Sequence, residues 1–217
     1  MKKLLLVFAC AVSALTMSAQ RASSSSSSFF STEKADGGVQ FGIRAGLNLA
    51  NLSFKEDGYS YSTDSRTTFH VGVIADIPLM QSLYVQTGLF LQNKGAKEEG
   101  DGYKTTLKPM YLQIPVLASY RYDFSDALQL QVNVGPYFAY GIGGKWEEEE
   151  DGESYEVDFF DDGIKRFDCG LQVGGGLTFA QHYYLGVAYE FGFTNIADES
   201  ETKIKNNNLM ISLGYNF

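Results

Sequence analysis

The chain has 217 residues, of which 44% are hydrophobic and 14% are aromatic, and its formal net charge is −9 at pH 7. This acidic balance excludes a nucleic-acid-binding protein, which needs clustered lysine and arginine. Two cysteines and two histidines supply neither a disulfide framework nor a metal cluster, so the sequence predicts no cofactor, no metal site and no catalytic residues.

The N-terminal segment, residues 1–19, is predicted to be a secretory signal peptide. Two lysines precede an apolar run over Leu4–Leu15, and small residues follow it. The run is too short to span a bilayer as a helix. A lipoprotein alternative that uses Cys10 is disfavoured because Cys10 lies inside the apolar run. Residues 20–38 include six consecutive serines and are predicted to form a disordered tether.

Residues 39–217 are predicted to form one domain of eight strands, because apolar and polar side chains alternate with a period of two. The predicted strands are Val39–Phe54, Thr67–Leu79, Leu83–Lys94, Leu107–Tyr122, Leu128–Ile142, Lys165–Phe179, Tyr183–Thr194 and Asn206–Phe217. The connectors alternate between long, polar segments and short turns. This pattern predicts an all-β fold, an eight-stranded antiparallel transmembrane up-and-down β-barrel of the outer membrane.

The aromatic residues of the apolar register gather at the strand ends. Those at the short-turn ends are Phe41, Tyr120, Tyr122, Phe179, Tyr183, Tyr215 and Phe217, and those at the long-loop ends are Phe69, Tyr140, Phe167, Phe191 and Phe193. Two aromatic girdles around an aliphatic belt indicate that the apolar face meets lipid. In the core of a soluble β-sandwich, aromatic residues are not expected to gather at the strand ends. The even strand number places both termini in the periplasm.

Polar residues of the opposite register are expected to fill the barrel interior, because eight strands leave room for little more than side chains. The predicted lumen network, structural in role, consists of Arg44, Asp76, Gln113, Gln131, Gln172 and Glu190. Arg44 and Asp76 are expected at matching depths on neighbouring strands, with Gln172 opposite Glu190, since buried charges need partners. The filled interior predicts a barrel that is not a porin.

Two prolines, Pro115 and Pro136, lie inside predicted strands although a closed barrel has no edge for a missing N–H. Counting from the turn between them places the two nearly opposite each other. A local bulge is therefore predicted there.

The longest connector, Gly143–Ile164, contains ten acidic residues. It is expected to be a solvated, self-repelling loop, with Ca²⁺ binding through its carboxylates as an alternative. Trp146, Phe159 and Phe160 within it are unusual for a loop that only meets solvent. They are predicted to be exposed and to contact an unknown protein or glycan partner.

Five motifs of the chain resemble the PorT-like family of outer-membrane β-barrel proteins, small barrels of the OmpA/OmpX type common in Bacteroidota. They are Phe41–Leu49, Tyr111–Pro115, Gly170–Gly176, Gly192–Ile196 and Ile211–Phe217. The resemblance implies a barrel embedded in outer-membrane lipid and lipopolysaccharide of a Gram-negative cell. It also implies insertion by machinery that recognises the C-terminal Phe217. The family usually shows Glu where this chain has Gln113, so no role for that carboxylate is carried over.

Three functions remain open from the sequence. The first is a structural or surface-binding barrel that uses its long acidic loops. The second is an accessory component of a protein secretion or uptake machine. The third, a lipid-modifying enzyme at the rim, would need His70 beside a serine and a carboxylate, and no Ser–His spacing supports it, so the chain is not predicted to be an enzyme.

Overall fold

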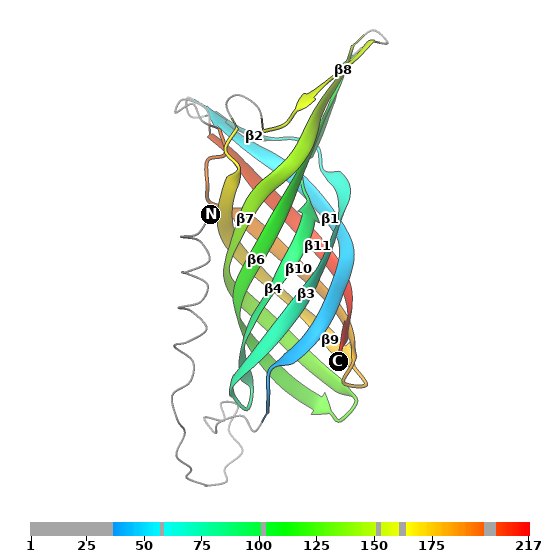
Figure 1. Ribbon diagram of the computed structural model, residues 1–217, viewed down its shortest axis with the longest axis vertical. Coiled ribbons are helices and arrows are strands. Elements are labelled where there is room, and N and C mark those ends of the chain that lie inside the picture. Colours follow the sequence, from blue (N-terminus) through cyan, green and yellow to red (C-terminus); the bar gives the residue numbers. More distant parts are fainter. Residues whose placement is uncertain (1–36, 57–58, 101–102, 151–152, 161–163, 198–202) are drawn as a thin grey trace.

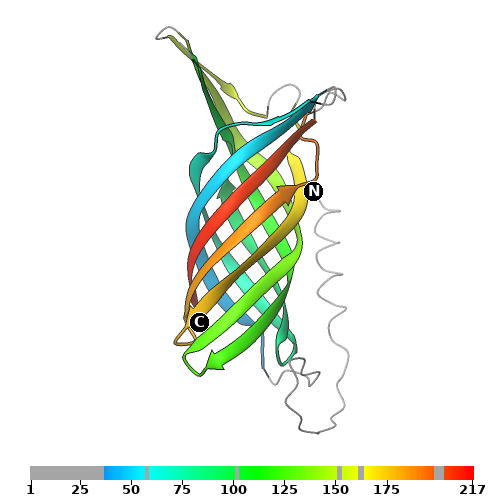
Figure 2. The same ribbon diagram turned by 180° about the vertical axis from the view of Figure 1, so that it is seen from behind.

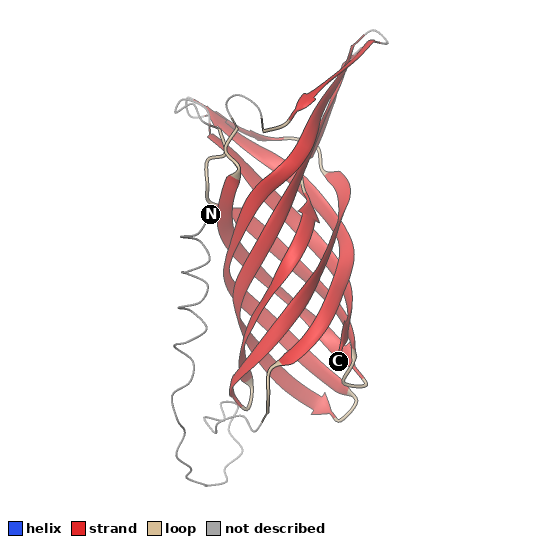
Figure 3. Ribbon diagram, viewed as in Figure 1, coloured by secondary structure: helices blue, strands red, loops and turns tan. Residues whose placement is uncertain are grey.

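The computed structural model describes residues 37–56, 59–100, 103–150, 153–160, 164–197 and 203–217. The predicted signal peptide, residues 20–36 of the predicted tether, and Asp151, Asp161 and Asp162 of the acidic connector lie outside the described residues. Every regular element among the described residues is a β-strand (Figure 3). In the same part of the chain, no helix is long and apolar enough to cross a membrane.

Eleven strands occur within the described ranges. They are β1 (Gln40–Glu56), β2 (Tyr59–Ser62), β3 (Arg66–Met80), β4 (Leu83–Asn93), β5 (Ala96–Gly100), β6 (Tyr103–Ser125), β7 (Leu128–Glu150), β8 (Glu153–Asp158), β9 (Phe167–Phe179), β10 (Tyr183–Gly192) and β11 (Lys203–Asn216).

Eight of these strands close into an antiparallel barrel (Figures 1 and 2). The ring order is β1, β3, β4, β6, β7, β9, β10 and β11, and β11 pairs back with β1 from Gly42↔Asn216 to Lys55↔Lys203. Each predicted strand corresponds to one ring strand. The predicted barrel class is therefore confirmed, and closure leaves no open edge in the ring.

The remaining strands, β2, β5 and β8, lie in the long connectors. The expectation that Gly143–Ile164 is a loop is wrong, because β7 continues to Glu150 and β8 pairs back along it. The first residues of β6, the end of β7 and β8 form a sheet that projects beyond the other strands in Figures 1 and 2. We call β6 from Tyr103 to Lys108, β7 from Lys145 to Glu150 and β8 the protruding sheet. Its acidic strands are held by the backbone ladder and by ion pairs with lysines across it.

The outward faces of the ring strands carry the predicted apolar belt. Val73, Val132, Val187 and Leu213 are all exposed. Exposed aromatics stand at both ends of this belt, with Phe41 and Tyr183 at the short-turn end and Phe69, Tyr140 and Phe193 at the other. The predicted register is thus confirmed, and the large apolar side chains face away from the barrel interior.

Glycines on the inner wall make room for large inward side chains. A Cβ at Gly46 would come within 2.7 Å of the His70 ring, and one at Gly72 within 2.6 Å of the Phe90 ring. At both positions a ring from a neighbouring strand therefore packs directly against the backbone of the glycine. This arrangement fills the narrow interior at close packing.

The predicted bulge at the two prolines is wrong. The β6–β7 register is the same at Pro115↔Tyr137 and Ala118↔Val134, and its shifts lie elsewhere, between Met110 and Tyr111 and near the turn. The β6–β7 pairing is interrupted between Pro115↔Tyr137 and Ala118↔Val134, and the β4–β6 pairing between Thr87↔Val116 and Phe90↔Gln113, while both registers are kept. The Thr87 hydroxyl donates to the Pro115 carbonyl at 2.8 Å and satisfies that acceptor without any change of register.

Candidate functional site

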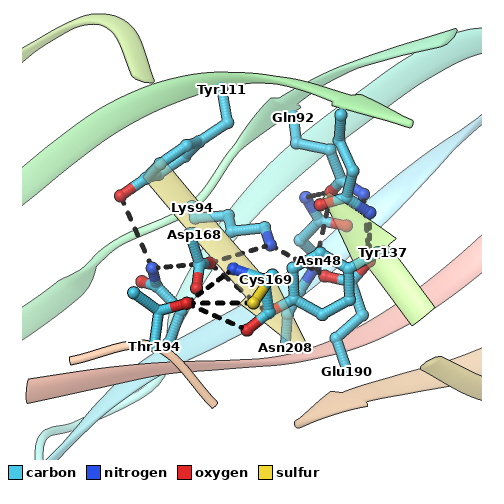
Figure 4. Close-up of polar contacts among 12 residues, drawn as sticks. Asn48, Gln92, Lys94, Tyr111, Tyr137, Asp168, Cys169, Glu190, Thr194 and Asn208 are labelled. Atoms are coloured by element: carbon cyan, nitrogen blue, oxygen red, sulfur yellow. Dashed lines mark hydrogen bonds and ion pairs between the residues drawn. The ribbon is translucent and has the colours of Figure 1, made fainter. Parts of the chain in front are cut away.

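A buried ion cluster fills the barrel interior near the end that carries the protruding sheet (Figure 4). Lys94, directly after β4, places its Nζ 3.1 Å from Glu190 Oε2 and 3.8 Å from Asp168 Oδ2. All three side chains are almost fully buried. Nζ also lies 4.3 Å from the centre of the Tyr137 ring, a favourable contact for a desolvated cation. Two carboxylates thus share one ammonium group in the interior.

Amide side chains surround these two carboxylates. Glu190 accepts hydrogen bonds from Gln113 Nε2 at 2.5 Å and from Asn208 Nδ2 at 3.2 Å. Asp168 accepts from Asn206 Nδ2 at 3.0 Å. The polar run at the start of β11 therefore serves the interior carboxylates, which need such donors because they are buried.

A second charged cluster lies toward the short-turn end. Asp76 Oδ2 is 2.5 Å from Arg121 Nη2, and Asp76 Oδ1 accepts a hydrogen bond from Gln86 Nε2 at 2.8 Å. Arg44 instead donates to Asn216 Oδ1 at 2.8 Å and lies 4.1 Å from the centre of the Tyr184 ring. The predicted matching depth of Arg44 and Asp76 is wrong, because the β1–β3 register sets Asp76 opposite Gln40, four positions from Arg44.

The other predicted lumen residues lie on the inner wall. Gln131 is buried and donates to Asn133 Oδ1 at 2.9 Å. Gln172 stands opposite Glu190 in the β9–β10 register, as predicted. The sequence reasoning missed Lys94 and Arg121, which carry the partner charges. Within the described residues, the fully buried charges are Arg44, Lys94 and Arg121 against Asp76, Asp168 and Glu190, so the interior is balanced.

His70 takes part in a buried series of hydrogen bonds. Its Nδ1 is 2.8 Å from Asn48 Oδ1 and its Nε2 is 2.9 Å from Ser212 Oγ. Ser212 comes from β11, 142 positions along the chain, so no local spacing could have revealed the pair. The register places His70 opposite Gly46, and its side chain is buried in the barrel interior. Both ring nitrogens have partners, which is the state of a satisfied interior histidine.

The protruding sheet carries an aromatic and apolar patch, in which Tyr155 and Val157 are exposed whereas Trp146 is half-buried against the apolar cluster of the barrel. Trp146 and Val157 are directly opposite in the β7–β8 register, and Tyr155 and Val157 are 63% and 58% exposed. Together with Glu148, whose carboxylate accepts from Trp146 Nε1 at 3.0 Å, they line a shallow cavity of about 250 Å³. We call Trp146, Tyr155 and Val157 the sheet patch. Within the described strands, β8 pairs only with β7, so its other edge is open.

Phe159 and Phe160 correct the prediction for the acidic connector. They are 2% and 7% exposed, and the Phe160 ring makes an edge contact with Tyr111 at a centroid distance of 5.6 Å. The expectation that they are exposed is wrong, because the chain after β8 folds back over the barrel opening. There these rings cover the apolar cluster that contains Tyr111 and Tyr137, so they close the barrel rather than meet a partner.

Ion pairs connect the strands of the protruding sheet. Lys145 Nζ is 2.5 Å from Glu156 Oε1, and Lys108 pairs with Glu147. The hydrogen bond and charge of Lys145 lower the pKa of Glu156, and Glu156 in turn raises the pKa of Lys145. In the described part of the connector no group of three or more metal-ligating side chains converges.

A family model described as an outer membrane protein beta-barrel domain matches residues 19–198. None of the curated proteins compared with the chain matches it. Among solved structures, Ail, the attachment invasion locus protein of Yersinia pestis, is 18% identical with a TM-score of 0.43, and the alignment covers 83% of this chain and 100% of Ail. OprG from Pseudomonas aeruginosa is 15% identical with a TM-score of 0.45, over 85% of this chain and 97% of OprG.

Proposed function

Because the chain belongs to the outer membrane protein beta-barrel domain family, we propose that it is a surface-binding barrel whose partner docks on the protruding sheet. The observation that carries the proposal is the sheet patch beside the open edge of β8. A row of unpaired backbone groups can add an extended segment of another protein, and exposed rings beside it supply apolar contact. Of the possible partners, a protein strand fits this edge better than a glycan.

The charge of the sheet specifies the partner further. The protruding sheet contains seven acidic residues, all on β7 and β8, against three lysines, Lys104, Lys108 and Lys145. A partner segment rich in lysine or arginine would pair with these carboxylates, and their field would speed its approach. The proposed partner is therefore an extended, basic protein segment.

The orientation proposed for the barrel follows from where its ends lie. β1 begins and β11 ends at the short-turn end, opposite the protruding sheet (Figures 1 and 2). With both termini in the periplasm, the protruding sheet stands outside the cell, and the apolar belt contacts membrane lipid and lipopolysaccharide. Phe217, exposed at the short-turn end, is then available to the insertion machinery.

The filled interior supports a function without a pore. Two charged clusters and the Phe159–Phe160 cover occupy the barrel axis. We expect the purified protein to give no stable conductance in planar bilayers, because eight strands enclose no continuous water path. Reproducible channels of porin size would contradict this part of the proposal.

Site-specific photocrosslinking in outer membranes tests the docking surface. A benzoylphenylalanine at Tyr155 should give one discrete protein adduct, and its yield should fall as salt screens the acidic strands. The same probe at Leu213, equally exposed but in the apolar belt, serves as the matched control. Adding Val157→Lys should abolish the adduct while the barrel remains folded. An adduct that survives both salt and Val157→Lys would refute docking at the sheet patch.

Two alternatives are separated by the same approach. An accessory of a secretion or uptake machine that contacts the machine through its periplasmic turns would give crosslinks from Gln181 instead. A hydrolytic enzyme is favoured only by the Ser212–His70 contact. Because His70 is 1% exposed, we expect no labelling of Ser212 by a fluorophosphonate, and labelling would establish the enzyme.

A further inference from the structure

A cavity of about 310 Å³ opens at the short-turn end of the barrel. Its inner lining comes from six ring strands, through Gln40, Tyr84, Arg121, Gln129, Thr178 and Asn216. Because these residues surround the barrel axis, the cavity faces the aqueous compartment at this end rather than membrane lipid. In the orientation proposed above, that compartment is the periplasm.

Two buried donors in this cavity lack a partner among the described residues. Arg121 is 5% exposed; its Nη2 contacts Asp76 and its Nη1 reaches Gln40 Oε1 at 3.4 Å, whereas its Nε has no hydrogen-bond acceptor. Thr178 is 3% exposed, and its Oγ1 likewise makes no hydrogen bond within the described chain. Buried donors are nearly always satisfied, so two such groups lining one cavity point to an acceptor supplied from outside.

The charge around these donors fits an anion. Arg44 and Arg121 face a single buried carboxylate at this end, that of Asp76, so the interior here carries one excess positive charge. Two further carboxylates, Asp123 and Asp126, lie at the mouth, but both are exposed to solvent, where water and salt screen them. Asp123 is also engaged by Gln129 Nε2 at 2.7 Å.

We propose that this cavity binds a small oxyanion, a carboxylate or phosphate group of a solute, through Arg121 Nε and Thr178 Oγ1. A guanidinium N–H and a hydroxyl are the donors that recognise such groups, and a charged acceptor makes these hydrogen bonds strong. The volume corresponds to roughly ten water molecules, so a molecule of a few non-hydrogen atoms enters together with some water. The inference is independent of the sheet patch.

Thr178→Val is the informative variant because it removes the hydroxyl and keeps the shape. Since Oγ1 makes no hydrogen bond within the described chain, its loss should leave the stability in urea unchanged or slightly raised. Thr105→Val, on the protruding sheet and remote from the cavity, is the matched control. A clear loss of stability in Thr178→Val would mean that the hydroxyl has a structural partner, and would overturn the inference.

Binding is measured on the folded, full-length barrel in an uncharged, phosphate-free detergent. The Arg121 Nε–Hε resonance is followed by NMR while sodium acetate or sodium phosphate is added, with sodium chloride at equal ionic strength as the reference. We expect a saturable shift with acetate, phosphate or both, about tenfold weaker in Thr178→Val and unchanged in Thr105→Val. No saturable shift, an equal shift with chloride, or a shift that appears only when phospholipid is added would refute a site for a soluble oxyanion.

Discussion

Replacing Lys94 by methionine tests the interior ion cluster most directly. The substitution keeps the length and volume of the side chain but removes the ammonium group that lies 3.1 Å from Glu190 and 3.8 Å from Asp168. Removing one partner of a buried ion pair costs about 3–5 kcal/mol, because the remaining charge stays buried without compensation. We expect Lys94→Met to lower the free energy of unfolding by that amount, measured by urea unfolding in lipid vesicles with the gel shift of the folded barrel as readout.

Lys97→Met provides the control for this experiment. Lys97 is three residues away and pairs with Glu99 at 2.7 Å, but both side chains are well exposed, so its removal should cost less than about 1 kcal/mol. The double variant Lys94→Met with Glu190→Gln should be less destabilised than the sum of the single variants, with a coupling of about 0.5–3 kcal/mol. Equal losses of unfolding free energy in Lys94→Met and Lys97→Met would show that water reaches the ion cluster. Strictly additive effects in the double variant would show that Lys94 and Glu190 are not coupled.

Four further predictions concern the apolar belt, the protruding sheet and the interior cover. Val73→Arg, at mid-depth of the apolar belt, should cost about 2–4 kcal/mol in the same unfolding assay, because that face meets hydrocarbon. Replacing Glu147–Glu156 by a two-residue Asn-Gly turn should leave insertion and the gel shift intact, whereas Phe160→Ala should cost about 3–5 kcal/mol because it opens the interior cover. Lys145→Ala should raise the pKa of Glu156 toward its ordinary value in a ¹³C NMR titration. In the parent chain the Lys145–Glu156 pair stabilises the fold at pH values above the ordinary carboxyl pKa. This stabilisation is lost as the pH falls through the lowered pKa of Glu156.

The alternation of side chains predicted the ring because it reflects a local property, the two faces of a strand. The depth of a side chain along the barrel depends instead on the register between strands, and the spacing of residues within one strand does not predict that register. Arg44 and Asp76 illustrate this: both point inward as predicted, but the register separates them, and Arg121 from β6 supplies the partner of Asp76.

The acidic connector shows a second limit. Consecutive glutamates are poor strand formers by composition, so Glu147–Glu150 read as a solvated loop. They are held in β7 by the ladder to β6 and, at Glu147, by an ion pair with Lys108 of β6. Phe159 and Phe160 are unusual for a solvated loop, but only the fold-back of the chain after β8 reveals that they cover the barrel. Lys94 gave no signal because it stands at a strand end, beside Gly95, where lysines usually face solvent.

The length of β6 and β7 has a mechanical consequence. Each strand has 23 residues and therefore spans roughly 75 Å, and the two stay paired from Tyr103↔Glu150 at the tip to Ser125↔Leu128 at the turn. The ladder hydrogen bonds lie across the strands, so tension on the tip along the strands loads many of them in shear at once instead of peeling them one by one. A pulling force on the protruding sheet is thus transmitted to the ring as a whole, and the sheet is a mechanically stiff extension of the barrel.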